Sequence, residues 1–486
     1  ENGNVPTTIK MLTSSVKHVA GPLVRSMMVD ATSRSIFRDY EACVKCDACV
    51  SACEEQGFNV YDWCENGNVP TTCGDVPLEQ SRCVGCGQCT TVCPVASIVE
   101  SDHLTDVEAL LVMKDELKAQ GKILVASVAP TVRVGISEPF GEDVGTNLEH
   151  QIATGLRNLG FDYVFDTCFT ADLTIMEEGT ELLGRLTDPD AVLPMFTSCC
   201  PGWVNSVEKL YPELIPNLSS CMSPQGMMGS MVKTAFAQKI GVAPEDIIHV
   251  SLMPCTAKKD EMARPDLLGD VNYVLTVREA ARLFQNAGVD LPNLEPGLYD
   301  TPLGESTGAG VIFGASGGVM EAGLRTAYEL LVGEPLPSLD LESVRGVDQY
   351  DGIKMATVNI AGYGDLKVAV AHGGEQLNEI AQGVIDGDEE FEGLGFIEVM
   401  CCPGGCIGGG GQPPCGGDAD TLATRAQGLY TLDSADRDER VSHHNAGVAE
   451  LYATILGGAP NSHEAHHLLH THFEDRSGSV DQPEAE

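Results

Sequence analysis

The chain has 486 residues, of which 43% are apolar, so it is long enough to fold into two or three domains with sizeable cores. Its 71 Asp and Glu residues outnumber 29 Lys and Arg, and the formal net charge of −42 would repel nucleic acid and anionic membranes. The sequence contains neither the run of about eighteen apolar residues that spans a bilayer nor a secretory signal pattern. We therefore expect no membrane insertion and a cytoplasmic location.

Residues 1–40 form a mixed N-terminal segment in which basic residues nearly balance the acidic ones. The segment either docks an acidic electron carrier or covers part of the domain that follows it. The octapeptide ENGNVPTT at 1–8 recurs at 65–72, which either local duplication or a sequence-assembly error would explain.

Residues 41–100 contain ten of the 19 cysteines, at spacings too short and regular for a disulfide framework in a chain this large. Each of two runs, C-x2-C-x2-C-x3-C, supplies three thiolates to one 4Fe-4S cube and usually a fourth to the other cube. By that rule one cube is held by Cys43, Cys46, Cys49 and Cys93, and the other by Cys83, Cys86, Cys89 and Cys53. The alternative, zinc ribbons or unliganded thiols, would not need the third and fourth cysteines of each run.

In residues 101–473 the sequence pattern changes, and short apolar runs alternate with helix-like stretches. This pattern predicts α/β structure with two four-stranded, mostly parallel sheets flanked by helices, preceded by a two-cluster ferredoxin-like α+β domain. Any active site then lies between the two lobes at the carboxyl ends of the strands. The expected strands are 122–130, 162–166, 192–198 and 246–254 in one set, and 272–277, 310–315, 367–373 and 395–400 in the other. The polar stretch 473–486, which includes an acidic tail at 474–486, is expected to be disordered.

Three segments place further cysteines at expected strand ends: TSCCPGW (197–203), MPCTAKKDE (253–261) and EVMCCPGGCIGGGGQP (398–413). Four widely separated thiolates could converge there on one more cube, namely Cys200, Cys255, Cys402 and Cys406. The glycines at 404, 405 and 408–411 would let the backbone approach a bulky cofactor closely.

In these three segments the sequence resembles the FeFe hydrogenases, and the resemblance runs from about residue 41 to about residue 473. It implies an H-cluster, in which those four cysteines hold a 4Fe-4S cube and Cys406 bridges to a two-iron subsite. That subsite carries carbon monoxide, cyanide and an azadithiolate, and separate maturation proteins deliver it. The resemblance also implies that Met253 and Met400 pack against the subsite and that Lys258 hydrogen-bonds a cyanide ligand. A thiolate-bound iron pair in a dry cavity beside an ammonium group suits this chemistry.

A proton relay is the second implication. Cys199 matches the family residue that passes protons to the bridging amine, so it should remain unligated. Glu178, Glu181 and Arg185 are spaced by three and four residues on one expected helical face, and matching to the family adds Ser219 between the glutamates. A buried glutamate with a raised pKa can accept and release protons near neutrality. Spacing alone would also fit a salt-bridged surface helix.

The remaining cysteines are expected to be small buried or reducible thiols: Cys64, Cys73, Cys168, Cys221, Cys401 and Cys415. Cys401, directly before a predicted ligand, could instead alter oxygen sensitivity or compete for iron. The histidine-rich stretch 463–472 has the composition of a metal tract but resembles the family's closing helix, where packing or a carboxylate partner is expected.

We therefore expect an enzyme that interconverts protons and electrons with molecular hydrogen, relaying electrons through two 4Fe-4S clusters. The alternatives are a non-catalytic cytosolic iron–sulfur assembly factor of the same fold and a sensory hydrogenase. Ferredoxin is the expected electron carrier, and NAD-linked activity would require flavin- and nucleotide-binding partner subunits. Direct nucleotide binding is not expected, because no Walker or Rossmann glycine pattern follows a convincing strand.

Overall fold

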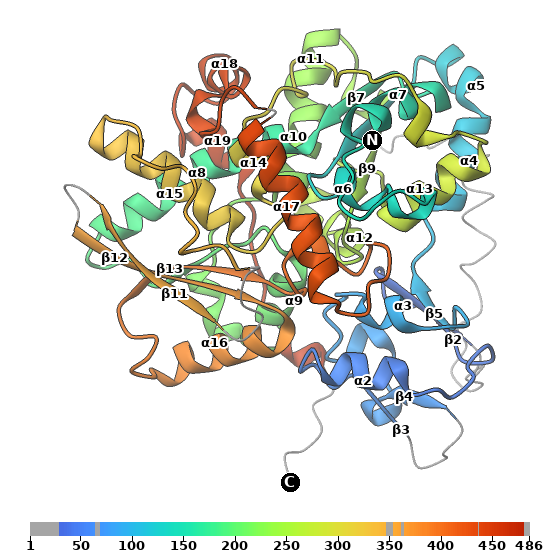
Figure 1. The fold of residues 1–486 in the computed structure, drawn as a ribbon, viewed down its shortest axis with the longest axis horizontal. Helices are drawn as coiled ribbons and strands as arrows, with labels where there is room; N and C mark the ends of the chain where they lie inside the picture. Colours follow the sequence, from blue (N-terminus) through green and yellow to red (C-terminus); the bar gives the residue numbers. More distant parts are fainter. Residues whose placement is uncertain (1–28, 64–68, 347–352, 361–363, 436, 481–486) are drawn as a thin grey trace, which may run out of the picture.

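The computed structural model describes residues 29–63, 69–346, 353–360, 364–435 and 437–480. Most of the predicted N-terminal segment, the first copy of the repeated octapeptide and Cys64 lie outside these residues. Figure 1 shows a small N-terminal domain (blue, lower right) below a larger body that contains two separate sheets. No helix of the described residues is both long and apolar enough to cross a membrane.

The N-terminal domain is built around two short helices, α2 (Ala48–Glu54) and α3 (Gln88–Val92), which pack on each other. Its antiparallel sheet has the order β1-β2-β5, and a separate hairpin pairs β3 with β4. The strands are β1 (Val29–Asp30), β2 (Ile36–Asp39), β3 (Tyr61–Trp63), β4 (Pro70–Thr72) and β5 (Ile98–Glu100). The sheet thus begins before residue 41, because β2 pairs with the strand that follows the second cysteine run.

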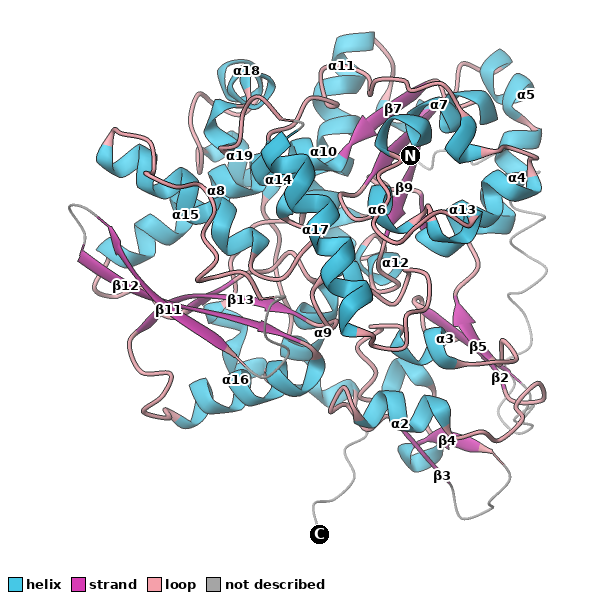
Figure 2. Ribbon diagram, viewed as in Figure 1, coloured by secondary structure: helices cyan, strands magenta, loops and turns pink. Residues whose placement is uncertain are grey.

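The first lobe of the larger body contains a fully parallel sheet in the order β10-β9-β6-β7. Its strands are β6 (Ile123–Val128), β7 (Tyr163–Asp166), β9 (Ile247–Met253) and β10 (Tyr273–Thr276). Helices cover both faces, so these strands are almost continuously apolar (Figure 2). One face packs against α4 (Leu104–Val112), α7 (Glu149–Leu159) and α13 (Val277–Asn286), and the other against α10 (Pro224–Met231).

The second lobe contains a sheet in the order β11-β12-β13-β8, in which only the β11–β12 pair is antiparallel. Its strands are β8 (Met195–Phe196), β11 (Lys354–Ile360), β12 (Gly364–His372) and β13 (Leu394–Met400). One face is covered by α9 (Pro201–Leu210) and α16 (Gly374–Asp386), and the other by α15 (Gly318–Val332). The prediction of two four-stranded, mostly parallel sheets is confirmed.

Two details of the predicted sheets are wrong. The segment 310–315 is no strand, because its first part belongs to helix α14 (Gly308–Ile312), which packs between α8 (Thr167–Thr187) and α17 (Ala419–Ala435). A β-carbon at Gly310 would lie only 2.3 Å from the carbonyl oxygen of Cys168, so small residues are needed where α14 meets α8. The strands also do not divide by sequence order, since β8 joins the second sheet and β10 the first.

Six further short α-helices complete the described chain, together with loops and 3₁₀ turns. The remaining helices are α5 (Lys114–Ala119), α6 (Val132–Gly135), α11 (Ala237–Ile240), α12 (Lys258–Glu261), α18 (Ala446–Thr454) and α19 (His463–Leu469). A π-helical turn at Val232–Phe236 joins α10 to α11.

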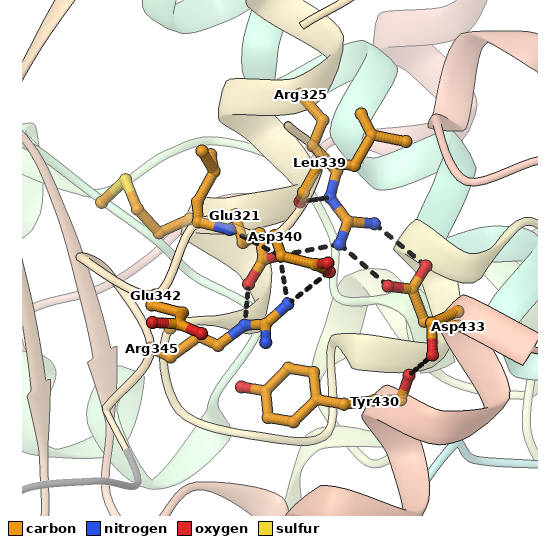
Figure 3. A network of polar contacts seen from close by, with 12 residues as sticks. Glu321, Arg325, Leu339, Asp340, Glu342, Arg345, Tyr430 and Asp433 are labelled. Carbon is orange, nitrogen blue, oxygen red and sulfur yellow. Dashed lines mark hydrogen bonds and ion pairs between the residues drawn. The ribbon is translucent and has the colours of Figure 1, made fainter. Parts of the chain in front are cut away.

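A charge network ties α15 to α17 and to the loop that follows α15 (Figure 3). The fully buried guanidinium of Arg325 lies 2.7 Å from Glu321 and 2.9 Å from Asp433. The guanidinium of Arg345 also pairs with Glu321, at 2.7 Å, and the guanidinium of Arg440 pairs with Asp433, at 2.6 Å. Each buried carboxylate therefore has two arginine partners, which offsets the cost of removing these charges from water.

The prediction of a disordered C-terminal stretch is wrong for residues 473–480. The backbone N–H of Arg476 donates to the carbonyl oxygen of Glu208 at 2.8 Å, and its guanidinium lies 3.3 Å from the buried Glu208 carboxylate. Val480 is also buried. The polar composition reflects ion pairing with α9, and residues 481–486 lie outside the described part of the chain.

Candidate functional site

The two cysteine runs of the N-terminal domain fold into loops of matching geometry. The residues on either side of the second cysteine have positive φ angles in both runs: Lys45 (63°) and Asp47 (68°) in one loop, Gly85 (76°) and Gly87 (77°) in the other. A left-handed backbone conformation costs free energy for Lys and Asp, so the intrinsic preferences of these two residues do not explain the shape of the first loop. Such loops turn backbone N–H groups toward a central anion, as the 3.4 Å contact from Lys45 N to Cys43 Sγ illustrates.

The thiols of these runs lie in two groups that cross between the runs. In the first, the Cys49 thiol lies close enough to the thiols of Cys43 and Cys93 to interact with them electrostatically. In the second, the neighbours of Cys89 are Cys86, Cys83 and Cys53. Cys46 is exposed at the surface end of the first loop, and all these thiols are free of disulfides. Seven of the eight thiols thus fall into two groups drawn from crossed runs, as 4Fe-4S cubes require.

The cysteines of the three further segments lie at the carboxyl ends of three strands, as predicted. Cys199 and Cys200 stand between β8 and α9, and Cys255 follows the last residue of β9. Cys402 follows β13, and Cys406 begins a 3₁₀ turn, Cys406–Gly408. The two sheets thus contribute residues to one place, because the ends of their parallel strands meet between the lobes.

At this place the four predicted ligands converge around one cavity. Cys255 has Cys402, Cys200 and Cys406 as its electrostatic neighbours, and all four thiols are free. The cavity between them has a mostly apolar wall that also includes Cys199, Met253, Lys258, Phe313 and Met400. Four soft sulfur donors with thioethers nearby fit an iron–sulfur group rather than a hard, oxygen-preferring cation.

Lys258 is the cationic group at the wall of this cavity. Its ammonium lies 2.9 Å from both carboxylate oxygens of Glu261 and donates to the carbonyl oxygen of Cys199 at 3.1 Å. Burial alone would lower the pKa of Lys258, but the Glu261 carboxylate raises it, so the side chain stays charged. Sequence reasoning missed Glu261 as the partner, although the i,i+3 spacing on α12 was the available signal.

Behind the cavity, Cys199 and Glu178 form the start of a polar path. Burial, with Glu178 nearby, raises the pKa of the Cys199 thiol, which therefore keeps its proton at neutral pH. Burial, reinforced by the Glu181 carboxylate, raises the pKa of Glu178 to about 8. Neither carboxylate oxygen of Glu178 makes a hydrogen bond of normal geometry within the described residues, and the Ser219 hydroxyl and Ser198 N–H are its polar neighbours.

The path continues from Ser219 to the surface. The buried Ser219 hydroxyl donates to Glu181 Oε2 at 3.0 Å, and Arg185 lies 2.6 Å from Glu181 Oε1. Arg185 also donates to the carbonyl oxygens of Pro216 and Leu218, and its side chain remains 18% exposed. All the residues predicted for the relay therefore lie along one route from the cavity to solvent.

The N-terminal domain touches the cavity through its second loop. Gln88 Nε2 donates to the carbonyl oxygen of Gly408 at 2.9 Å, and a β-carbon at Gly410 would lie 2.1 Å from the carbonyl oxygen of Cys86. Gly410 thus allows close contact with the cysteine loop, while Gly409 lines the cavity. The buried Cys401 thiol lies between Cys402 and Cys86.

Other residues singled out in the sequence lie outside these groups. Cys168 is buried against Arg133, Cys73 and Cys415 are partly exposed, and Cys221 is buried next to Glu181. The histidine-rich stretch contains α19, and its last turn brings His470 within 3.3 Å of Glu177, the kind of carboxylate partner that was expected.

Comparison with known proteins agrees with this geometry. The family described as "Iron only hydrogenase large subunit, C-terminal domain" matches residues 122–410, more than half of the chain. The chain belongs to the iron-only hydrogenase family. Residues 42–97 of this hydrogenase match a "4Fe-4S dicluster domain", and residues 419–476 match "Iron hydrogenase small subunit". One polypeptide thus contains segments that match both a large and a small subunit.

Relatives and solved structures support the same family. The NADP-reducing hydrogenase subunit HndD of Solidesulfovibrio fructosivorans is 43% identical, over 91% of this chain and 75% of its own length. The periplasmic [Fe] hydrogenase large subunit of Nitratidesulfovibrio vulgaris is 41% identical, over 73% of this chain and 90% of its own length. A solved [FeFe]-hydrogenase of Chlamydomonas reinhardtii is 42% identical with a TM-score of 0.67, covering 77% of this chain and 99% of the other.

Assembly factors, the alternative function considered for this fold, are also among the similar proteins, but at lower identity. Cytosolic iron-sulfur assembly component 3 of Bos taurus is 31% identical over 82% of this chain and 84% of its own. The higher identity to hydrogenases and the solved hydrogenase structures decide between the two. The protein is an FeFe hydrogenase, which interconverts protons and electrons with molecular hydrogen at an H-cluster and also carries two 4Fe-4S clusters.

Proposed function

We propose that Cys200, Cys255, Cys402 and Cys406 would hold the 4Fe-4S part of the H-cluster, and that Cys406 would also be a ligand of its two-iron subsite. The observation that carries this assignment is the convergence of the four free thiols on one apolar cavity. When bound, the H-cluster supplies the iron centre at which electrons and protons combine.

The chain's own residues prepare this cavity. Met253 and Met400, the last residues of β9 and β13, place flexible thioether side chains at the wall and exclude water from it. Lys258 holds a fixed positive charge at the wall of the cavity, where it would hydrogen-bond a cyanide ligand of the two-iron subsite. Its bond to Glu261 prevents the ammonium from swinging away.

Protons travel along the path behind the cavity. Cys199 donates its thiol proton toward the cavity and is reprotonated by Glu178. The pKa of about 8 suits Glu178 to this role, because the carboxyl group exchanges its proton near neutrality. Ser219 connects it to Glu181, and Arg185 holds Glu181 in place at the edge of the protein.

The N-terminal cysteines hold the two electron-transfer cubes in crossed sets. Cys43, Cys46, Cys49 and Cys93 hold the first cube, and Cys53, Cys83, Cys86 and Cys89 hold the second. The exposure of Cys46 supports a position of the first set near the surface. The close approach of Gly410 to the carbonyl oxygen of Cys86 supports a position of the second set beside the glycine loop that follows Cys406. A ferredoxin-type carrier therefore docks over the first set.

The partners include the maturation proteins that deliver the two-iron subsite and a redox carrier. A carrier of the ferredoxin type is favoured by the dicluster domain, while a relative named as a subunit of an NADP-reducing hydrogenase makes partner subunits the second candidate. A cytoplasmic location remains a prediction, and one of the relatives is named as periplasmic.

The test is infrared spectroscopy of the matured protein together with a hydrogen-evolution assay. We expect intrinsic carbonyl and cyanide stretching bands and hydrogen production from a reduced viologen dye. Iron–sulfur signals without those bands and without hydrogen evolution would instead favour the assembly-factor function.

A further inference from the structure

A second set of polar contacts leaves the relay at Glu181. The Ser220 hydroxyl lies 3.2 Å from Glu181 Oε2 and 2.8 Å from His470 Nδ1. Backbone hydrogen bonds hold the two segments in register, since Met222 N donates to Leu469 O at 2.8 Å and Thr471 N donates to Ser220 O at 2.9 Å. Glu181, already bonded to Ser219 and Arg185, is thus a branching point and not simply the end of one route.

His470 lies between the relay and a buried carboxylate. Its side chain is 2% exposed, and its Nε2 atom faces Glu177 Oε2 at 3.3 Å. Glu177 lies one helical turn before Glu181 on α8, and the Tyr452 hydroxyl holds its other oxygen at 2.5 Å. The His470 ring thus spans from Ser220, which contacts the relay, to the buried carboxylate of Glu177.

The branch continues to solvent through a second histidine. The ring of His466, one turn earlier on α19, stacks on that of His470 with centroids 4.3 Å apart and planes 8° from parallel. His466 is exposed, so its ring connects the stacked pair to solvent. Partial burial and the neighbouring His470 lower the pKa of His466, which therefore releases a proton readily to water.

We propose that Ser220, His470 and His466 form a second branch of the proton relay, which carries protons between Glu181 and the surface of α19. The proposal rests on the relay role assigned above to Glu178 and Glu181. Outward transfer moves the proton of the Glu181 carboxyl to Ser220 Oγ while the original hydroxyl proton passes to His470 Nδ1. The resulting imidazolium then gives up one ring proton through water to His466, and inward transfer reverses these steps.

The groups that face His470 come from every element around it. They are Glu177 and Glu181 of α8, Cys221 of the segment before α10, Tyr452 of α18 and His466 of α19. Ligand atoms of Glu181, Cys221 and His470 lie within 4.8 Å of one another, but Arg185 already supplies a cation to Glu181. Proton transfer suits this arrangement better than a metal ion, which would compete with the guanidinium for that carboxylate.

The experiment compares three variants of the matured enzyme: His466→Gln, His470→Gln and the control His467→Gln, an exposed residue of the same helix outside the branch. Hydrogen evolution is measured from pH 5.5 to 8.5 in H₂O and D₂O, with and without added imidazole. Infrared bands and the melting temperature report on the H-cluster and on folding. Glutamine keeps a hydrogen-bonding side chain of similar size but cannot carry a proton.

We expect His466→Gln and His470→Gln to lose about three- to tenfold in turnover, less than the 10²–10⁴-fold of a sole acid–base group, because Arg185 marks a route that remains open. The solvent isotope effect should rise, imidazole should restore part of the activity of His466→Gln, and His467→Gln should match the parent. Parental turnover and isotope effect in both branch variants would overturn the proposal, as would a lower melting temperature with neither isotope effect nor rescue.

Glu178→Gln separates this proposal from the relay itself. If Glu178→Gln is inactive while both histidine variants behave as the parent, only the branch is wrong. If Glu178→Gln turns over normally, the relay assignment fails and the branch fails with it. Should His470→Gln not fold, the exposed His466→Gln still decides the question.

Discussion

Replacing Glu178 by glutamine tests the relay directly, because glutamine copies the neutral carboxyl in size and polarity but cannot pass on a proton. With a pKa of about 8, roughly one Glu178 side chain in ten is ionised at pH 7, so both protonation states are accessible during turnover. Positioned acid–base groups contribute about 10²- to 10⁴-fold to rate, and we expect hydrogen evolution by Glu178→Gln to fall by that factor. The infrared bands should remain, since Glu178 is no ligand.

The same substitution has a consequence for stability that follows from the raised pKa. The shift from 4.5 to about 8 means that the folded protein binds the Glu178 proton more tightly than the unfolded chain does. The free energy of unfolding therefore decreases as pH rises from about 4.5 to about 8, by up to about 1.4 kcal/mol per pH unit and about 5 kcal/mol in total. Glutamine does not ionise, so the variant should gain stability relative to the parent across this range.

Urea unfolding of both proteins at pH 5 and pH 8 measures this difference. Glu178→Gln should be close to the parent at pH 5 and clearly more stable at pH 8. A stability difference that is the same at both pH values would refute the burial argument for Glu178. Turnover within about twofold of the parent would refute its place in the relay, because a sole acid–base group contributes far more.

Four further predictions follow from the site and the core. Cys199→Ala should keep the carbonyl and cyanide bands but lower turnover by about 10²-fold or more, and near-normal activity would contradict its role as proton donor. Lys258→Met should lower the content of the two-iron subsite relative to cubane iron, measured by infrared intensity against total iron; an unchanged ratio would count against the cyanide contact. Cys53→Ser should perturb the paramagnetic signal of the second cube and spare the first, and the reverse would contradict the crossed ligand sets. Arg325→Met should cost about 3–5 kcal/mol in urea unfolding, because it leaves two buried carboxylates under-compensated, and a loss below about 1 kcal/mol would show that these charges are solvated.

The sequence predicts the grouping of the cysteines well, because their spacing is a local property. The two runs and the strand-end segments each place their thiols through a short loop, and the structure brings them together in the expected groups. The order of strands within each sheet is a long-range property. Strand β8 lies in the second sheet and β10 in the first, the reverse of the prediction, and no local sequence pattern indicates this.

Helix α14 illustrates a second limit. A run of five or six apolar residues fits a buried strand or a buried helix equally well. The segment Gly308–Ile312 is a helix that packs between α8 and α17, and its small residues allow this close packing. Similarly, the acidic composition of residues 473–480 predicts disorder, yet Arg476 finds a buried carboxylate on α9 that is distant in sequence. The partner Ser220 of His470 could not be found either, because it depends on a backbone bridge between segments about 250 residues apart.

The division of the four cavity cysteines between the sheets has a consequence for the whole molecule. Cys255 extends from the sheet of β9, whereas Cys200, Cys402 and Cys406 extend from the sheet of β8 and β13. A metal group bound to all four cross-links distant parts of the chain, much as a set of disulfides would, and its binding energy adds to that of folding. Oxidative loss of iron would then loosen the seam between the lobes and expose it to proteases, so that damage to the cofactor also marks the polypeptide for removal.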